Sequence, residues 1–150
     1  MTKKDIESGK VLQLENQFCF PLYSATNAVV RAYRPLLEKL DLTYPQYLVM
    51  MVLWSQNGIN VKELGNKLYL DSGTLTPLLK RLSSKGLVER RRAQHDERVR
   101  ELHLTEQGQE LKLEAEKVPS AMLCALDMDL EDLIQMKQLC EKLLNKLDRD

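Results

Sequence analysis

The stretch NVKELGNKLYLDSGTLTPLLKRLSSKGLVERRR, residues 60–92, decides the fold. Asn60 is suited to cap a first short helix, because its side chain can accept a hydrogen bond from a backbone amide of the first turn. The apolar face of this helix consists of Val61, Leu64 and Leu68. A second helix follows a turn at Tyr69-Leu70 and closes at Gly86. Its apolar face consists of Leu75, Leu78, Leu79 and Leu82. Two short helices joined by a tight turn predict a helix-turn-helix.

The sequence leaves the start of the second helix open. Asp71 and Ser72 are both capping candidates, with Pro77 then inside the helix. If Thr74 is the cap instead, Pro77 falls at the third position, where no intrahelical hydrogen bond is lost. These starts remain alternatives at this point.

Two strands are expected after the second helix, at residues 87–92 and 98–104. In the second strand, Leu102 and Leu104 alternate with Glu101 and His103, which is typical of a half-buried strand. The polar residues 93–97 between the strands form the expected hairpin tip. A helix-turn-helix followed by a basic hairpin predicts a winged helix-turn-helix over residues 45–104.

Upstream, an apolar pattern near a 3.6-residue period runs over residues 12–40 and predicts a long helix. Pro21 is comfortable only in a first turn, so the regular helix should begin near Phe20, or an earlier turn kinks there. Pro35 predicts a second kink or a break. A new helix should start after Thr43 or Tyr44 and run from Gln46 to about Ser55. It is apolar almost all round and is therefore expected to be buried.

Downstream, Thr105 is expected to cap a helix that continues toward Lys117 and is interrupted by Pro119. Asp129 can cap a last helix with a wide apolar stripe. That stripe comprises Leu130, Leu133, Ile134, Leu139, Cys140, Leu143, Leu144 and Leu147. Helices with more apolar surface than a small wing domain can cover predict an oligomer interface. The expected fold is mainly α with a small β-hairpin wing, one protomer over residues 1–150, with residues 12–40 and 105–147 forming the interface of a homodimer.

The charge is distributed unevenly along the chain, although the net charge of the 150 residues is zero. Residues 80–100 hold eight Lys and Arg against three acidic residues, a net charge of +5, whereas residues 101–150 hold six basic and twelve acidic residues, a net charge of −6. A local basic block favours binding to double-stranded DNA, although a solvated charged face would look the same. No apolar run is long enough to span a membrane and the first ten residues lack the apolar region of a secretory signal, so the expected location is cytoplasmic.

The candidate DNA-binding residues lie on the second helix and at the hairpin. Hydroxyls near the helix start can hydrogen-bond phosphates or base edges, and cationic side chains farther along can neutralise phosphate charge. An Arg just past the hairpin tip can enter a narrow minor groove, where the negative potential is enhanced. The competing structural interpretation is plain capping for Ser72 and Thr74, and an exposed wing Arg that only meets phosphates. The candidates are Ser72, Thr74, Thr76, Lys80, Arg81 and Arg98.

Three cysteines, at 19, 124 and 140, fit neither a disulfide framework nor a zinc pattern. His95 and His103 have no ligand partners at useful spacing, and the chain has no Gly-rich phosphate loop or carboxylate dyad. We therefore expect no metal, no cofactor and no enzymatic activity. Each cysteine is either a small buried apolar residue or a redox site, and core packing is the favoured interpretation for Cys140.

Several stretches together resemble the organic hydroperoxide resistance regulators of the MarR family, over about residues 12–145. They are LENQFCFPLY (14–23), LTYPQYLVMMVLW (42–54), LYLDSGTLTPLLKRL (68–82), GLVERRR (86–92), DER (96–98) and LTEQG (104–108). The first three are specific to this family, whereas the DER motif and the helix pattern occur in MarR proteins generally. The resemblance implies a homodimeric repressor that binds operator DNA and senses organic hydroperoxides.

The resemblance also implies roles for individual residues. Cys19 matches the peroxide-reactive cysteine, and Tyr33 and Tyr44 match tyrosines that hydrogen-bond its sulfur. VPSAMLC, residues 118–124, matches the element that carries a second cysteine in some members. Cys124 would then be the resolving cysteine and form a disulfide with Cys19 of the other subunit. Pro21 departs from the aliphatic residue usual after CF, and Cys140 matches no motif.

The redox role requires a thiolate, because the anion attacks peroxide and the thiol does not. A helix that begins near Phe20 places Cys19 beside the positive end of the helix dipole, which favours the anion. Three alternatives remain open: a MarR-like regulator released by a small phenolic ligand with inert cysteines, a thiol peroxidase that turns over peroxide, and an architectural DNA-binding protein without operator preference.

Overall fold

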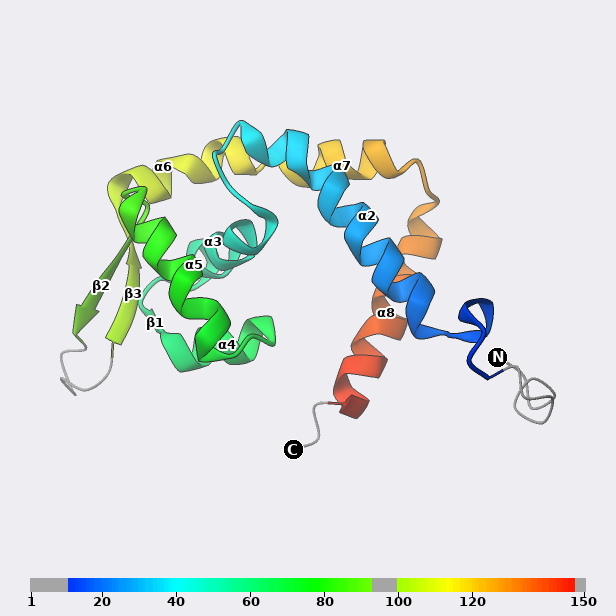
Figure 1. Ribbon diagram of the computed structural model, residues 1–150. Coiled ribbons are helices and arrows are strands. Elements are labelled where there is room, and N and C mark those ends of the chain that lie inside the picture. Colours follow the sequence, from blue (N-terminus) through cyan, green and yellow to red (C-terminus); the bar gives the residue numbers. More distant parts are fainter. Residues whose placement is uncertain (1–10, 93–99, 148–150) are drawn as a thin grey trace. The chain divides into compact units, whose positions relative to one another are not determined.

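The computed structural model describes residues 11–92 and 100–147 (Figure 1). The described elements, in chain order, are η1 (Leu14–Asn16), α2 (Cys19–Glu38), α3 (Tyr44–Ser55), β1 (Ile59–Asn60), α4 (Val61–Leu68), α5 (Ser72–Ser84), β2 (Val88–Arg92), β3 (Arg100–Leu104), α6 (Glu106–Ala115), α7 (Val118–Leu126) and α8 (Leu130–Leu147). The chain divides into two compact units, one up to Val118 and one from Pro119 onward. Among the described helices, none is both long and apolar enough to cross a membrane.

The first unit contains the expected helix-turn-helix and wing. Helices α4 and α5 are joined by a turn in which Tyr69 adopts a left-handed conformation with φ 54°. The hairpin of β2 and β3 follows α5, and Figure 1 shows it beside that helix. The sheet has three strands in the order β1-β3-β2, because the two-residue strand β1 pairs Ile59 with Leu102 on the other edge of β3. The sequence did not predict β1, since two residues are too few to show an alternating pattern.

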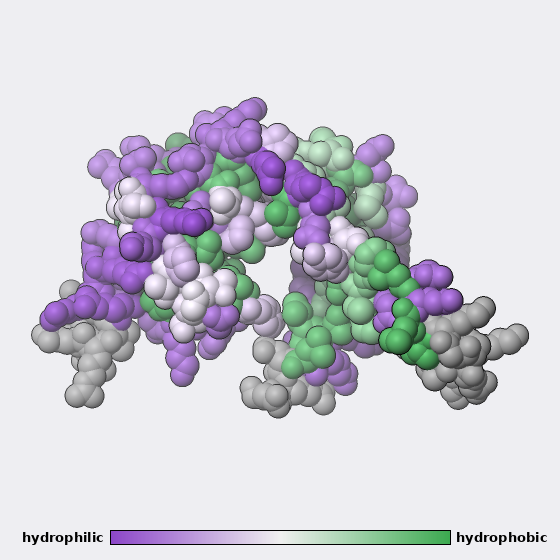
Figure 2. Space-filling view, in the orientation of Figure 1, coloured by the Kyte–Doolittle hydropathy of each residue, from purple (hydrophilic) through white to green (hydrophobic). Residues whose placement is uncertain are grey.

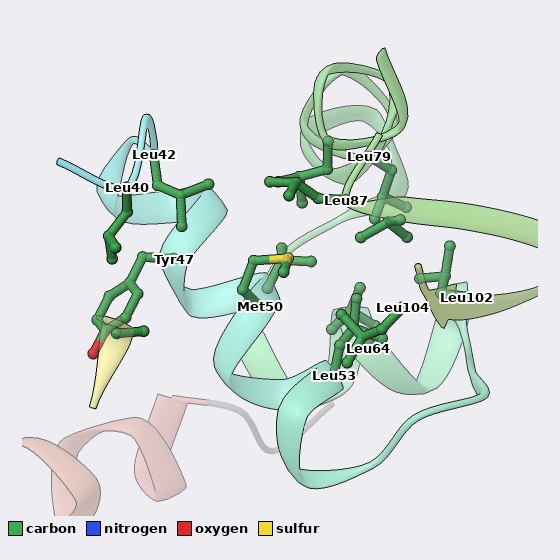
Figure 3. Close-up of a cluster of buried hydrophobic side chains, with 14 of the residues drawn as sticks. Leu40, Leu42, Tyr47, Met50, Leu53, Leu64, Leu79, Leu87, Leu102 and Leu104 are labelled. Carbon is green, nitrogen blue, oxygen red and sulfur yellow. The ribbon is translucent and has the colours of Figure 1, made fainter. Parts of the chain in front are cut away.

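The core lies where α3, α4 and α5 pack on the sheet. Figure 3 shows Met50, Leu53, Leu64, Leu79 and Leu102 gathered there from four different elements, and all five are fully buried. Burial of a leucine side chain contributes about 1.5–3 kcal/mol, so this cluster is the main source of stability in the winged unit. Its position holds α5 with one face inward and the other free.

The start of α3 resolves one open alternative. Thr43 is the cap: its hydroxyl accepts a hydrogen bond from the Gln46 amide at 3.4 Å, while the Gln46 side chain accepts one from the Thr43 amide at 3.0 Å. The prediction that α3 is buried all round is wrong, because Met51 is exposed. A short helix that packs from one side leaves the opposite face uncovered, and Leu48, Met51 and Val52 line a surface hollow of about 250 Å³.

Pro21 lies where the sequence predicted, whereas Pro35 does not break its helix and Pro119 lies in the first turn of a new one. Pro21 is the third residue of α2, where no intrahelical donor is needed, so the start near Phe20 is confirmed within one residue. A break at Pro35 is not observed, because α2 continues to Glu38. Arg31, whose carbonyl loses its helical partner, is exposed, so water can satisfy that carbonyl. Pro119 is the second residue of α7 and so lies in the first turn of a separate helix that the sequence pattern did not predict.

Candidate DNA interface and redox centre

Helix α5 begins at Ser72 because Asp71 caps it. One carboxylate oxygen of Asp71 accepts a hydrogen bond from the Thr74 amide at 2.9 Å, and the other accepts one from the Thr74 hydroxyl at 3.0 Å. These bonds, that from the Thr74 amide foremost, lower the pKa of Asp71 below its ordinary value. Thr74 is therefore not the cap, and Pro77 stands at the sixth helical position rather than the third.

The two faces of α5 differ sharply. Leu75, Leu79 and Leu82 are buried in the core of the winged unit. The opposite face is exposed and carries four of the predicted DNA-binding side chains: Ser72, Thr76, Lys80 and Arg81. Figure 2 shows the region of α4 and α5 in white and purple, so this surface is polar to neutral rather than apolar. A helix held by its inner face with cations on its outer face can lie in a major groove.

The hydroxyl groups of α5 are bonded inside the helix. Thr76 donates its hydroxyl proton to the Ser72 carbonyl at 2.7 Å, and Thr74 donates its proton to Asp71. A hydroxyl has one proton, and phosphate oxygens only accept hydrogen bonds. In this arrangement Thr74 and Thr76 lie on the predicted helix but have no proton left for a phosphate.

The wing adds positive charge beside α5. Arg90 and Arg91 are exposed on β2, and Arg91 is paired with Glu89 of the same strand. The register places Arg92 opposite Arg100 on β3, which concentrates positive charge toward the tip of the hairpin. Arg98, predicted to enter the minor groove, lies outside the described residues.

Cys19 is the first residue of α2 and is exposed. Phe18 precedes the helix and provides no side-chain hydrogen bond to its first turn, so amides at the helix start remain available to an anion there. Phe18 and Phe20 on either side of Cys19 are exposed as well. Figure 2 shows hydrophobic surface over η1 and the first turns of α2. The cysteine therefore lies within an apolar surface at the positive end of a helix.

The tyrosines form a cluster at the other end of α2. The ring of Tyr33 lies 4.7 Å from that of Tyr44 and 6.1 Å from that of Tyr47, measured between centroids. Burial raises the pKa of all three hydroxyls, so they stay protonated and can donate hydrogen bonds at neutral pH. The sequence analysis missed Tyr47, although it stands three residues after Tyr44 on the same helix, a spacing that puts both rings on one face.

Within one chain, the helix separates Cys19 from the tyrosine cluster. Tyr33 follows Cys19 by fourteen residues on α2, and a rise of 1.5 Å per residue puts the two about 21 Å apart. A hydrogen bond between them within one protomer is therefore excluded. The other cysteines lie in the second unit, where Cys124 is exposed on α7 and Cys140 is half-buried on α8.

A hollow of about 340 Å³ lies between the C-terminal end of α2, the start of α3 and the end of α5. Its apolar wall includes Val30 and Leu37, and its charged lining residues are Arg34, Glu38, Asp41 and Lys85. Lys85 forms an ion pair with Asp41 at 2.8 Å and donates to the backbone carbonyl of the same residue. The sequence did not predict this site, because the lining residues within 30–45 form no recognisable motif and Lys85 comes from a distant part of the chain. Across residues 11–92 and 100–147, no cluster of three or more His, Cys, Asp or Glu is arranged to hold a metal ion.

Comparison with known proteins identifies relatives along most of the chain. Residues 31–115 match the family described as transcriptional regulator SarA/Rot. The organic hydroperoxide resistance transcriptional regulator of Bacillus subtilis is 46% identical over 136 residues, covering 91% of this chain and 92% of that protein. Among solved structures, reduced AbfR bound to DNA has a TM-score of 0.77 at 34% identity, covering 93% of this chain and 95% of that one. Disulfide-formed AbfR has a TM-score of 0.61 at 34% identity, covering 97% of each chain. AbfR is a protein of Staphylococcus epidermidis.

Proposed function

Because the chain belongs to the organic hydroperoxide resistance regulators of the MarR family of winged-helix transcriptional regulators, we propose that it is a peroxide-sensing repressor. It binds operator DNA as a homodimer in the cytoplasm while Cys19 is reduced, and it releases the DNA when an organic hydroperoxide oxidises Cys19. The observation that carries this proposal is the exposed Cys19 at the first position of α2 in a chain so similar to a hydroperoxide regulator.

The DNA-binding part of the proposal rests on α5 and the wing. The outer face of α5 presents Lys80 and Arg81, and β2 presents Arg90 close by in the same unit. Lys and Arg at such positions neutralise phosphates and release counterions, so binding weakens steeply as salt rises. A solved structure of the relative AbfR contains DNA. A homodimer would present two such faces, which suits an operator with two similar half-sites.

The sensing step is a two-electron oxidation of sulfur. The Cys19 thiolate attacks one peroxide oxygen, the O–O bond breaks, and the alkoxide leaves with a proton as an alcohol. The sulfur becomes a sulfenic acid. The exposed Phe18 and Phe20 beside Cys19 favour an organic peroxide over hydrogen peroxide, because they offer an apolar surface to its alkyl group.

The tyrosines act on Cys19 only across a dimer. Since Tyr33 is about 21 Å from Cys19 along the same helix, the hydroxyls of Tyr33 and Tyr44 would reach the sulfur of the partner subunit. A second copy also accounts for the exposed apolar residues at the start of α2 and along α8, which a soluble monomer would leave in water. Because burial keeps these hydroxyls protonated, they are suited to donate to a thiolate.

Cys124 is the proposed resolving cysteine. Its thiolate attacks the Cys19 sulfenic sulfur of the other subunit, a disulfide forms, and the hydroxyl leaves as water after gaining a proton. Cys124 is exposed on α7, so its sulfur is accessible within its own unit. A structure of the relative AbfR has been solved in a disulfide-bonded form. A shift from nearly all bound to nearly all released needs about 5.5 kcal/mol, which a covalent bond can supply.

The test is an operator mobility shift with reduced protein, before and after an organic hydroperoxide. We expect Cys19→Ser to bind the operator as the wild type does and to stay bound after peroxide. Cys124→Ser should lose the intersubunit cross-link on a non-reducing gel. The matched control is Cys140→Ser, which should keep both responses. Release that persists in Cys19→Ser would contradict the sensor role of this residue.

A second candidate is supported by the hollow at the end of α2. Its apolar wall and Arg34, beside the Lys85–Asp41 ion pair, could accept a small phenolic compound with an acidic group, in a regulator that responds without redox chemistry. This candidate predicts that salicylate weakens DNA binding with no change in the number of free thiols. An Arg34→Ala variant would then lose the salicylate response, and an organic hydroperoxide would release the DNA from neither the wild type nor this variant.

A further inference from the structure

The outer face of α5 carries an apolar group, the methyl of Thr76, at a position where the sequence predicted a hydroxyl contact to DNA. Thr76 is exposed and directs its hydroxyl back to the Ser72 carbonyl at 2.7 Å. This bond turns the hydroxyl proton toward the helix backbone, and the exposed side chain also carries a methyl group on Cβ. Thr76 therefore has its methyl group, but no hydroxyl proton, to offer to anything that contacts this face.

Pro77 is next to Thr76, and its position costs the helix stability. It is the sixth residue of α5, where its missing amide leaves the Gly73 carbonyl without its usual partner. A proline in a helix interior destabilises the helix strongly relative to alanine, because it removes a backbone hydrogen bond and its ring clashes with the preceding turn. The ring of Pro77 is exposed and does not belong to the buried core, so packing in the core does not offset this cost.

Gly73 has no side chain that could cover the ring of Pro77. It is exposed one turn before Pro77, and a Cβ at this position would come within 2.9 Å of the Asp71 carboxylate oxygen that caps the helix. A larger residue would disturb the cap. The Thr76 methyl and the Pro77 ring consequently form a small apolar patch beside Gly73 on an otherwise polar helix face.

We propose that Thr76 and Pro77 recognise the 5-methyl group of a thymine in the major groove of each operator half-site. This inference rests on the proposed function, since it requires α5 to lie in a major groove. The thymine methyl is the apolar group that the base pairs present in that groove. Contact with Thr76 and Pro77 removes it from water, whereas a cytosine at the same place would leave its amino group against carbon without a hydrogen bond.

The contact predicts a preference for thymine over uracil. The two bases have the same hydrogen-bonding groups and differ only in the methyl. Burying one methyl contributes ~0.8 kcal/mol, which corresponds to about a four-fold change in affinity for each half-site. A hydrogen-bonding contact to the thymine O4 would not distinguish the two bases.

The experiment first selects double-stranded DNA from a random library with the reduced wild-type protein. Each thymine of the selected site is then replaced by deoxyuridine, and Kd is measured by fluorescence anisotropy. We expect one or two thymines in each half-site at which uracil weakens binding about four-fold. If no sequence is enriched, the proposed function fails. If a sequence is enriched but uracil is tolerated at every thymine, only this inference fails.

Two variants assign the effect to the residues named. Thr76→Ser keeps the hydroxyl that bonds Ser72 and removes the methyl, and Pro77→Ala restores an amide for the Gly73 carbonyl, so both should fold. In each variant we expect the uracil penalty at the matching thymine to fall below about two-fold. The matched control is Thr26→Ser, because exposed Thr26 donates the same kind of hydrogen bond to the Leu22 carbonyl, at 2.9 Å, on α2. A penalty that stays near four-fold in both α5 variants would overturn the proposal.

Discussion

Helices α5 and α8 are both amphipathic and rich in leucine, yet they bury very different parts of their apolar faces. In α5, Leu75 and Leu79 are at most 1% exposed, because α3, α4 and the sheet cover them. In α8, Leu139 and Leu147 are 67% and 73% exposed. The winged half of the chain completes its own core, whereas the last helix presents an uncovered apolar face. The difference supports the proposed homodimer, in which a second copy would cover the apolar face of α8.

The largest expected effect comes from replacing one leucine in each helix, which tests the difference in burial between α5 and α8. Leu79→Ala leaves a cavity in the core and should lower the free energy of unfolding by about 3 kcal/mol. Leu139→Ala removes an exposed side chain and should change it far less when the protein is dilute. Thermal unfolding at low protein concentration measures both. Equal losses in the two variants would show that α8 is as much a part of the single-chain core as α5.

A charge placed on the apolar face of α8 tests directly whether this face forms the dimer interface. Leu139→Glu should weaken self-association by about tenfold, because a carboxylate buried at an interface loses its hydration. Sedimentation equilibrium measures the dissociation constant. The control is Met51→Glu, which adds the same charge to an exposed apolar position on α3. Dimers that persist unchanged in Leu139→Glu would place the interface elsewhere.

The winged half is also held by caps, and removing one should have a smaller effect. The Thr105 hydroxyl accepts a hydrogen bond from the Gly108 amide at 3.0 Å and donates to the Gly86 carbonyl. Thr105→Ala should therefore lower the free energy of unfolding by about 1 kcal/mol. Thr105→Ser keeps the hydroxyl and should stay close to the wild type in chemical denaturation. A serine variant as unstable as the alanine variant would assign the loss to the methyl group instead.

The smallest expected effect is the pH dependence of the α5 cap. The hydrogen bonds from Thr74 lower the pKa of Asp71, so the folded state favours the carboxylate. The stabilisation is then fully present above the ordinary pKa of an aspartate and is lost as the pH falls through the lowered value. Asp71→Asn can still accept from the Thr74 amide but carries no charge. The Tm difference between wild type and Asp71→Asn should narrow between pH 6 and pH 3, and a constant difference would contradict this cause.

Thr74 and Thr76 show what the sequence could and could not predict about α5. The apolar spacing of Leu75, Leu79 and Leu82 predicted which side of α5 points outward, and the structure confirms it. The hydrogen-bond partner of the Thr74 hydroxyl depends on which residue caps α5, and the sequence allowed several capping residues. Because Asp71 is the cap, the Thr74 hydroxyl donates its hydrogen bond to Asp71, and Pro77 is the sixth residue of α5.

Local features were readable from the sequence because their partners are near in the chain. Asn60, Thr105 and Gly86 act as predicted, since a cap bonds three residues away and a left-handed residue with φ 71° favours glycine. The winged helix-turn-helix could be predicted from the spacing of apolar residues for the same reason, since that spacing depends on residues a few positions apart.

Only the tertiary structure decided the rest. It paired Ile59 with Leu102, joined the Trp54 indole to the Gly108 carbonyl at 2.8 Å, and brought Lys85 to Asp41. These contacts span 43, 54 and 44 residues of chain, as counted from their residue numbers. No local pattern encodes such pairs, because their energy is gained only after the whole core has closed and brought distant segments together.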